Sequence, residues 1–317
     1  MSDILNDDFL IKIVEESFDI EKLKQIIHEM SITAWGNRIE RPHLDRWLRN
    51  FDGSVLRNEG VEKKIALWLL INFTFYSDKE IRALCRYMYE DYIHSKLLQY
   101  DSVGFMSKDS ITKKIQHIID STVFLPLGNP SESGTNILYF FRQENGLSKQ
   151  SFVLSDGVEY ENAVFIDDVT ISGSQASLYI KDKCFNTKNN FILTFIATDE
   201  AIQYLSQEQT EFKLIYSILL DDRSKCFSTN SFVFSGIRSG CILSLAKKMC
   251  EGYGNLIFPS NPLGFGNGQY LFGFFYNTPD NTLPIIWGNV GKWMPIFPRY
   301  DKKYGQSEAD INESKYY

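Results

Sequence analysis

The chain has 317 residues, of which 44% are hydrophobic and 23% are charged. This length and composition predict a folded globular protein, built as one large domain with an appendage or as two domains, and argue against disorder or a disulfide-stapled miniprotein. The formal net charge is −7, so the sequence lacks the basic excess that is typical of direct nucleic-acid binders. Aromatic residues reach 15%, which indicates a core with many large rings.

Targeting and metal-site signals are weak throughout the sequence. The first residues are acidic where a signal peptide needs basic ones, and the longest largely apolar run, residues 65–76, is shorter than the roughly 18 residues of a transmembrane helix. No CxxC pair joins the five cysteines, so neither a zinc site nor a disulfide framework is indicated. We therefore expect a cytoplasmic protein with reduced thiols and no membrane contact. The cysteines are Cys85, Cys184, Cys226, Cys241 and Cys250.

Residues 1–120 are predicted to form an all-helical section. Apolar residues recur three and four positions apart over residues 9–18, 20–30, 62–75 and 79–98, as on one face of a helix. Asp19 precedes one run, and Ser77 with Glu80 forms a capping box before another. Three tryptophans of this section are expected to anchor helix packing, although they could instead face a partner. They are Trp35, Trp47 and Trp68.

Residues 121–300 have a different texture, in which short apolar runs rich in β-branched residues alternate with helix-compatible stretches. The runs cover residues 122–127, 163–166, 191–197, 214–220 and 270–276. This alternation predicts an α/β fold with a mostly parallel sheet and flanking helices. Ligands bind beyond the carboxyl ends of the strands in such sheets. The tail, residues 301–317, is polar and is expected to be loosely ordered.

The most informative stretch is an apolar run that ends in two adjacent acids, Asp167 and Asp168. Two carboxylates at the end of a buried strand are costly to desolvate, unless they face a cleft where hydroxyls, a cation or backbone donors meet them. Small residues follow, and then a helix begins, whose free N–H groups favour an anion. The pattern therefore predicts a sugar-phosphate site. The loop residues are Thr170, Ile171, Ser172, Gly173 and Ser174.

These residues resemble the phosphoribosyl-pyrophosphate (PRPP) motif of type I phosphoribosyltransferases, which has apolar residues, two acids, three variable positions and then Ser/Thr-Gly. The resemblance implies that Asp167 and Asp168 are the catalytic acids, which hold ribose hydroxyls directly or with Mg²⁺, and that residues 170–174 hold the 5′-phosphate. The same two carboxylates are the implied metal ligands. The alternative is an ordinary turn after two acids at a strand end.

A second, weaker match precedes this motif. The run over residues 123–127 leads into a small-residue loop in which Ser131, Ser133 and Gly134 resemble the family's pyrophosphate loop. A plain turn with a helix cap at Ser131 or Ser133 explains the pattern equally well. Arg142 and Lys149 lie between the two motifs, where the family often places basic residues that meet pyrophosphate, and surface solvation is their alternative role.

Two positions depart from the family pattern. Purine-using members commonly carry an acid where this sequence has Ile171, and Gln175 replaces the small residue expected two positions after the motif glycine. Backbone donors do most of the phosphate binding, so these departures affect the acceptor more than the phosphoribosyl donor.

Acids also follow other predicted strands. Asp221 and Asp222 end one run, where they either contact an acceptor or pair with Arg223 on the surface. Thr198 and Asp199 end another run at the same expected edge of the sheet.

The C-terminal stretch together with the helical section resembles a phosphoribosyltransferase-like subfamily associated with prokaryotic conflict systems, including effectors encoded beside retron reverse transcriptases. Asn277, Thr278 and Asn281 would line the acceptor side and Trp287 would stack a base. The alternative is a proline-bounded turn that packs a buried tryptophan.

The resemblance implies an enzyme that acts on PRPP or a related nucleotide with Mg²⁺ in antiphage defence. A second reading is a non-catalytic subunit that senses PRPP or a nucleotide and regulates a defence complex. In a third, the helical section docks to a protein or nucleoprotein partner.

Overall fold

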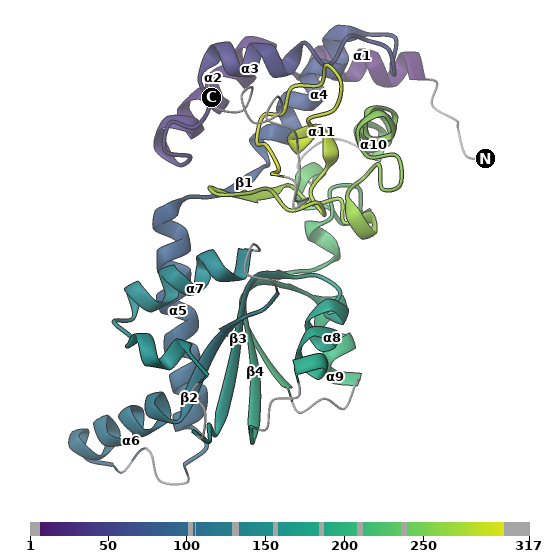
Figure 1. Cartoon of the computed structure of the whole chain (residues 1–317). Helices are drawn as coiled ribbons and strands as arrows, with labels where there is room; N and C mark the ends of the chain where they lie inside the picture. The colour runs from purple at the N-terminus through teal and green to yellow at the C-terminus, as the bar shows by residue number, and fades with distance from the viewer. Residues whose placement is uncertain are drawn as a thin grey trace.

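The computed structural model describes residues 7–100, 104, 106–128, 133–154, 158–183, 187–207, 212–235 and 240–300. Two parts lie one above the other in Figure 1. The upper part, called here the helical unit, contains α1 (Asp7–Ser17), α2 (Ile20–Thr33), α3 (Arg41–Leu48), α4 (Glu59–Ile71), α10 (Gly240–Ile257) and α11 (Pro284–Trp287). The lower part, the sheet unit, contains α5 (Asp78–Leu97), α6 (Lys108–Asp120), β2 (Thr122–Pro126), α7 (Ser133–Glu144), β3 (Asn162–Thr170), α8 (Ser174–Lys183), β4 (Asn189–Thr198), α9 (Asp199–Gln207) and β5 (Phe212–Leu220).

Four short 3₁₀ helices complete the described connections: η2 (Lys149–Phe152), η3 (Asp222–Ser224), η4 (Phe232–Phe234) and η5 (Phe265–Asn267). Strands β1 (Thr74–Tyr76) and β6 (Phe272–Phe274) lie between the two units. Part of the second predicted loop, including Ser131, lies outside the described residues.

Local capping signals start two of the helices as the sequence predicts. The Asp19 carboxylate accepts hydrogen bonds from the backbone N–H groups of Glu21 and Lys22, at 2.9 and 3.1 Å. The Glu80 carboxylate accepts the Ser77 backbone N–H at 2.7 Å. These side chains satisfy N–H groups that have no partner within the helix.

The helix expected over residues 62–75 is too long, because α4 ends at Ile71 and residues 74–76 form strand β1. β1 pairs in parallel with β6, nearly 200 residues later, with Thr74 opposite Phe272. The Thr74 N–H donates to the Leu271 carbonyl at 2.9 Å. Tertiary pairing therefore overrides the helical spacing of these residues. The strand predicted over residues 270–276 exists in its central part, but it pairs with β1 and not with the main sheet.

The mostly parallel sheet is confirmed. Its strand order is β2-β3-β4-β5, with all neighbours parallel. Val164 of β3 lies opposite Phe124 of β2 and Phe191 of β4. The pairing of β3 with β4 is continuous through Asp167, skips Asp168 and resumes at Val169. The register of the two strands is therefore the same before and after the acid pair.

Helices cover both faces of this sheet, as parallel strands require. α5, α6 and α7 pack on one face and α8 and α9 on the other (Figure 1). Successive residues of β3 alternate between the two layers: Val164 and Ile166 join the first core, and Ala163 and Phe165 join the second.

The core of the helical unit crosses the boundary that the sequence suggested near residue 120. It joins side chains of α1–α4 with side chains of α10, α11 and residues near 297. Trp47 is fully buried and its indole Nε1 donates to the Ile285 carbonyl at 2.9 Å, while Trp68 Nε1 donates to the Val233 carbonyl at 3.1 Å. The tryptophans are therefore packing anchors, and they bind the first helices to the last part of the described chain.

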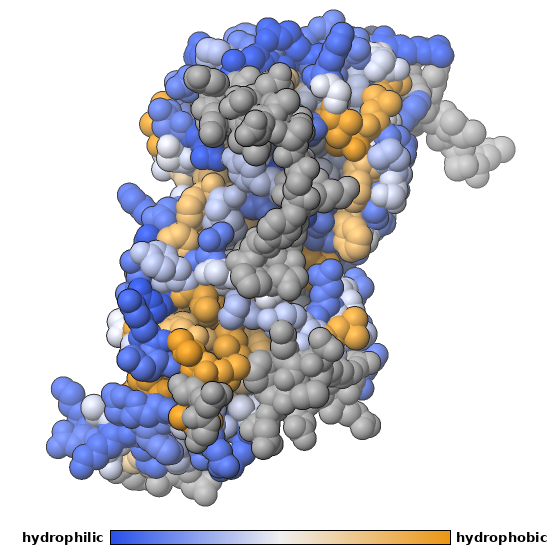
Figure 2. Space-filling view, viewed as in Figure 1, coloured by the Kyte–Doolittle hydropathy of each residue, from blue (hydrophilic) through white to orange (hydrophobic). Residues whose placement is uncertain are grey.

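The outer surface differs between the two units. Figure 2 shows hydrophilic side chains along the top of the molecule, over α1–α3, and a gathering of apolar side chains lower down, on the sheet unit. None of the described helices is both long enough and apolar enough to cross a membrane.

Cys85, Cys226 and Cys250 are buried free thiols, and burial raises the pKa of Cys85 to about 12.

Candidate functional site

The acid pair stands at the carboxyl end of β3, where the sequence places it. Both aspartates are partly buried, and the Asp167 Oδ1 atom accepts the backbone N–H of Asp168 at 2.9 Å. Residues that alternate along a strand point to opposite faces. Asp168 follows the alternation of Val164 and Ile166 and so points toward the α5–α7 side of the sheet.

The loop after the acids turns directly into α8. Gly173 has a φ of +73°, in the left-handed region that favours glycine. A Cβ atom at this position would lie 3.0 Å from Leu205 Cγ of α9. The hydroxyls of Ser172 and Ser174 lie 2.8 Å apart. The loop is thus held in a tight conformation in front of a helix N-terminus, the arrangement that suits a phosphate.

A neighbouring strand fixes this loop from the other side. The Thr198 hydroxyl at the end of β4 donates to the Ile171 carbonyl and accepts the Ala201 N–H at 3.1 Å. Thr198 therefore both caps α9 and anchors the motif loop, a structural role that its position after a strand did not reveal. The Ile171 side chain packs against the core of the α5–α7 face.

The start of α7 approaches the same edge of the sheet. A Cβ atom on Gly134 would lie 2.7 Å from the Leu127 carbonyl oxygen and 3.0 Å from the Ile166 carbonyl oxygen. Both contacts are to backbone, which cannot move aside easily, so only glycine allows this approach. Gly134 of the second predicted loop therefore lies next to the residue before Asp167. Ser133 begins α7, and its side chain lies outside the described part of the structure.

The two predicted basic residues are not brought to this edge. Arg142 lies in the last turn of α7, eight residues beyond Gly134, and a helix rises about 12 Å over that length. Its guanidinium lies 5.9 Å from the centre of the Tyr139 ring. Lys149 starts η2 and is exposed. Surface solvation accounts for both residues in this conformation.

Three buried hydroxyls near this edge have no hydrogen-bond partner among the described residues: those of Thr135 in the first turn of α7, Thr170 at the end of β3 and Ser177 in the first turn of α8. Only 4% of the Thr170 surface is exposed. Buried polar groups in native proteins are nearly always satisfied, so an unpaired one indicates an absent ligand or water.

A residue that the sequence analysis missed also reaches the acids. The Tyr276 hydroxyl donates to Asp168 Oδ2 at 3.2 Å. Burial, the two motif carboxylates and this hydrogen bond raise the pKa of Tyr276 well above its usual 10. Tyr276 was visible in the sequence only as the end of an apolar run. A separation of 108 residues hides its contact with Asp168 from any local pattern.

Other candidates have structural roles. Asp221 accepts from the Arg223 guanidinium at 2.7 Å, so the surface ion pair is the observed alternative.

Thr278 Oγ1 donates to the Phe297 carbonyl at 3.1 Å, and Asn281 Nδ2 donates to the Phe265 carbonyl at 3.0 Å. Trp287 Nε1 donates to the Thr282 carbonyl at 2.8 Å. The C-terminal signature thus forms a packed turn.

The donor set at β3 fits a magnesium ion that is shared with a ligand. Mg²⁺ prefers oxygen ligands and is commonly bound by one or two carboxylates together with substrate phosphates. Asp167 and Asp168 supply the carboxylates. Among the described residues, no three His, Cys, Asp or Glu side chains gather into a site that could hold a metal alone, so the phosphate groups of a ligand would have to complete the coordination.

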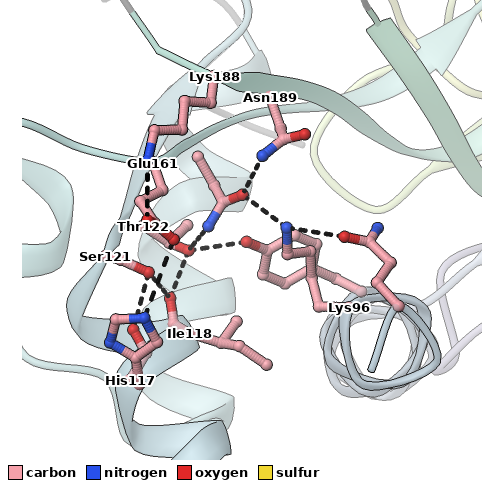
Figure 3. A network of polar contacts seen from close by, with 11 residues as sticks. Lys96, His117, Ile118, Ser121, Thr122, Glu161, Lys188 and Asn189 are labelled. Atoms are coloured by element: carbon pink, nitrogen blue, oxygen red, sulfur yellow. Dashed lines mark hydrogen bonds and ion pairs between the residues drawn. The ribbon is translucent and has the colours of Figure 1, made fainter. Parts of the chain in front are cut away.

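The opposite edge of the sheet has a polar network of a different kind, shown in Figure 3. Lys96 is 8% exposed, and its Nζ atom donates to Asn162 Oδ1 at 2.9 Å and to Gln99 Oε1 at 3.2 Å. Asn189 Nδ2 donates to the same Asn162 oxygen at 3.2 Å, and Asn162 Nδ2 donates to Thr122 Oγ1 at 3.3 Å. The network ties together the first residues of β2, β3 and β4. A cavity of about 230 Å³ lies beside it.

The family model named PRTase-CE matches residues 44–299. The chain belongs to the PRTase-CE family. This is a phosphoribosyltransferase-like family, and the match spans both units of the structure, including β1 and β6. No curated protein matches the chain. Among solved structures, the chain is similar to the AQ2163 protein from Aquifex aeolicus, with 10% identity and a TM-score of 0.29, over 58% of this chain and 86% of that one.

Proposed function

We propose that this PRTase-CE protein binds PRPP or a related nucleotide with Mg²⁺ at the carboxyl edge of its sheet and acts as a phosphoribosyltransferase-like enzyme. The observation that carries the proposal is the buried, unpaired Thr170 hydroxyl directly behind the acid pair. A sugar phosphate in front of the 170–174 loop would satisfy this group and would meet the free N–H groups of α8.

In this mechanism, Asp167 and Asp168 accept hydrogen bonds from the ribose hydroxyls. The C1–O bond to pyrophosphate breaks, pyrophosphate leaves with the bonding electrons, and a nucleophile forms a new bond to C1. Positive charge grows on the sugar ring in the transition state, and the fixed carboxylates stabilise it. Bound Mg²⁺ would neutralise charge on the leaving pyrophosphate. The loop after β3 holds the 5′-phosphate and so fixes the sugar.

Ile171 favours a second candidate, a sensor that binds the same ligand without turnover. The family acid that serves as a base is replaced here by an apolar side chain, which packs into the core instead of facing the ligand. In either case we place the protein in prokaryotic antiphage defence, on the basis of the resemblance to conflict-system proteins, with a protein or nucleoprotein partner docked on the helical unit.

Calorimetry with Mg²⁺ and PRPP tests the ligand, and a pyrophosphate-release assay separates enzyme from sensor. The double variant Asp167→Asn, Asp168→Asn is expected to lose binding while it keeps its thermal midpoint. The matched control is Asp221→Asn, Asp222→Asn, which changes two adjacent acids after β5 and should bind normally. A folded wild type that does not bind PRPP, or a motif variant that binds as well as the control, would contradict the proposal.

A further inference from the structure

Tyr276 connects the acid pair to a segment that lies outside the sheet unit. It follows β6, the strand that pairs with β1 between the two units. Its hydroxyl donates to Asp168 Oδ2 at 3.2 Å. The contact therefore joins the end of β3 to a strand held by the N-terminal part of the chain.

The position of Tyr276 is fixed by its neighbours. Its ring stacks on that of Phe274, with centroids 5.4 Å apart and planes within 9°, and meets the Phe275 ring edge-on at 5.1 Å. The Phe275 N–H donates to the Tyr76 carbonyl at 2.9 Å, just beyond the β1–β6 pairing. A tight turn follows, in which the Phe274 N–H donates to the Asn277 carbonyl at 2.8 Å. The hydroxyl is thus presented to Asp168 by a rigid, packed segment.

The chemistry of this contact suits a role beside a ligand. The Tyr276 hydroxyl is the donor in this contact, because an ionised carboxylate can only accept a hydrogen bond. An ionised carboxylate has about four lone-pair positions, so it can accept the bond from Tyr276 together with other hydrogen bonds or a cation. A hydrogen bond from a fixed donor also selects one orientation of the carboxylate group.

We propose that Tyr276 is a positioning residue, which orients the Asp168 carboxylate toward the sugar hydroxyls of the ligand and makes ligand binding depend on the β1–β6 segment. This inference rests on the proposed function of the same site. It assigns Tyr276 a role in affinity and not in bond breaking.

The test compares Tyr276→Phe with Tyr270→Phe in the full chain. Tyr270 is buried six residues earlier in the same segment, so both variants remove one hydroxyl and keep the ring. Titration with Mg²⁺ and PRPP in a calorimeter should show about tenfold weaker binding for Tyr276→Phe, because hydrogen bonds to charged groups contribute about 1.5 kcal/mol or more. Tyr270→Phe should bind like the wild type, and the thermal midpoints of all three proteins should be alike.

A spectroscopic readout distinguishes positioning from a general effect on packing. The absorbance of a tyrosine changes when its hydroxyl exchanges or strengthens a hydrogen bond. Addition of Mg²⁺ and PRPP should therefore produce a near-ultraviolet difference spectrum in the wild type and in Tyr270→Phe. The Tyr276 component of this spectrum should be missing from Tyr276→Phe at saturating PRPP.

Each outcome has a defined meaning. Weaker binding together with loss of the spectral component supports the positioning role. Unchanged affinity in Tyr276→Phe, or equal weakening in both variants, overturns it and leaves the proposed function intact. A folded wild type that does not bind PRPP overturns the proposed function, and the positioning role fails with it.

Discussion

The two ends of β3 differ in how their polar groups are paired. At its start, Asn162 is 1% exposed, and its amide bonds with Lys96, Asn189 and Thr122. At its end, the acid pair is partly exposed, and the Thr170 hydroxyl has no partner among the described residues. A closed polar network stabilises a fold, whereas buried groups that lack partners cost free energy unless a ligand satisfies them. The polar groups are therefore paired at one edge of the sheet, whereas the other edge, with an unpaired buried hydroxyl, is the candidate ligand site.

The largest effect that sharpens this comparison is expected from Asn162→Leu. Leucine removes the oxygen that accepts from the buried Lys96 ammonium, so the variant should lose about 3 kcal/mol of unfolding free energy. Urea denaturation measures the loss. PRPP affinity of the folded variant should not change, because the substitution is at the opposite edge.

Asn189→Leu is the matched control, since it removes only one donor to the same oxygen. It should cost about 1 kcal/mol. If Asn162→Leu reduced PRPP affinity as well as stability, the polar network would also contribute to ligand binding, and the contrast between the two edges would be wrong.

An intermediate effect is expected from Gly173→Ala in the motif loop. The left-handed backbone and the nearby Leu205 should together cost about 2 kcal/mol, and the distorted loop should bind PRPP more weakly. Gly36→Ala is the control, because Gly36 has a similar φ of +61° and no atom within 4 Å of an added Cβ. It should cost about 1 kcal/mol and leave binding unchanged. Equal effects of the two variants on PRPP affinity would remove Gly173 from the site.

The smallest effect is a pH dependence at the other edge. Burial and, secondarily, the charge of Lys213 lower the pKa of Lys96 below 10.5. The unfolded chain therefore keeps this proton over a pH range in which the folded chain has released it, and stability from this group rises with pH across that range.

Lys96→Met keeps the aliphatic stem and removes the charge. The unfolding free energy of the wild type relative to this variant should increase as pH rises from neutral toward 10.5, as measured by urea denaturation at each pH. If the difference in unfolding free energy between the two proteins did not change with pH, burial would not lower the pKa of Lys96.

Much of the candidate site could be predicted because its signal is local. The apolar run of β3, the two acids, the small residues and the helix that follows lie within about 20 residues, and the structure joins them as the sequence predicts. Gly134 came from a weaker local pattern and also lies at this edge. Arg142 and Lys149 were chosen by their place between motifs, but the length of α7 separates Arg142 from Gly134 by about 12 Å.

The sequence by itself determined the parallel sheet, the capped starts of α2 and α5, and the small-residue loop between β3 and α8, because hydrophobic periodicity and capping act between residues close in the chain. Only the tertiary structure decided that residues 74–76 leave the helical pattern to pair with β6, that Trp47 donates to the Ile285 carbonyl, and that Tyr276 meets Asp168. These contacts join segments between 108 and 238 residues apart. Their free energy comes from burial and hydrogen bonding that exist only once these distant segments have packed together, so no local pattern encodes them.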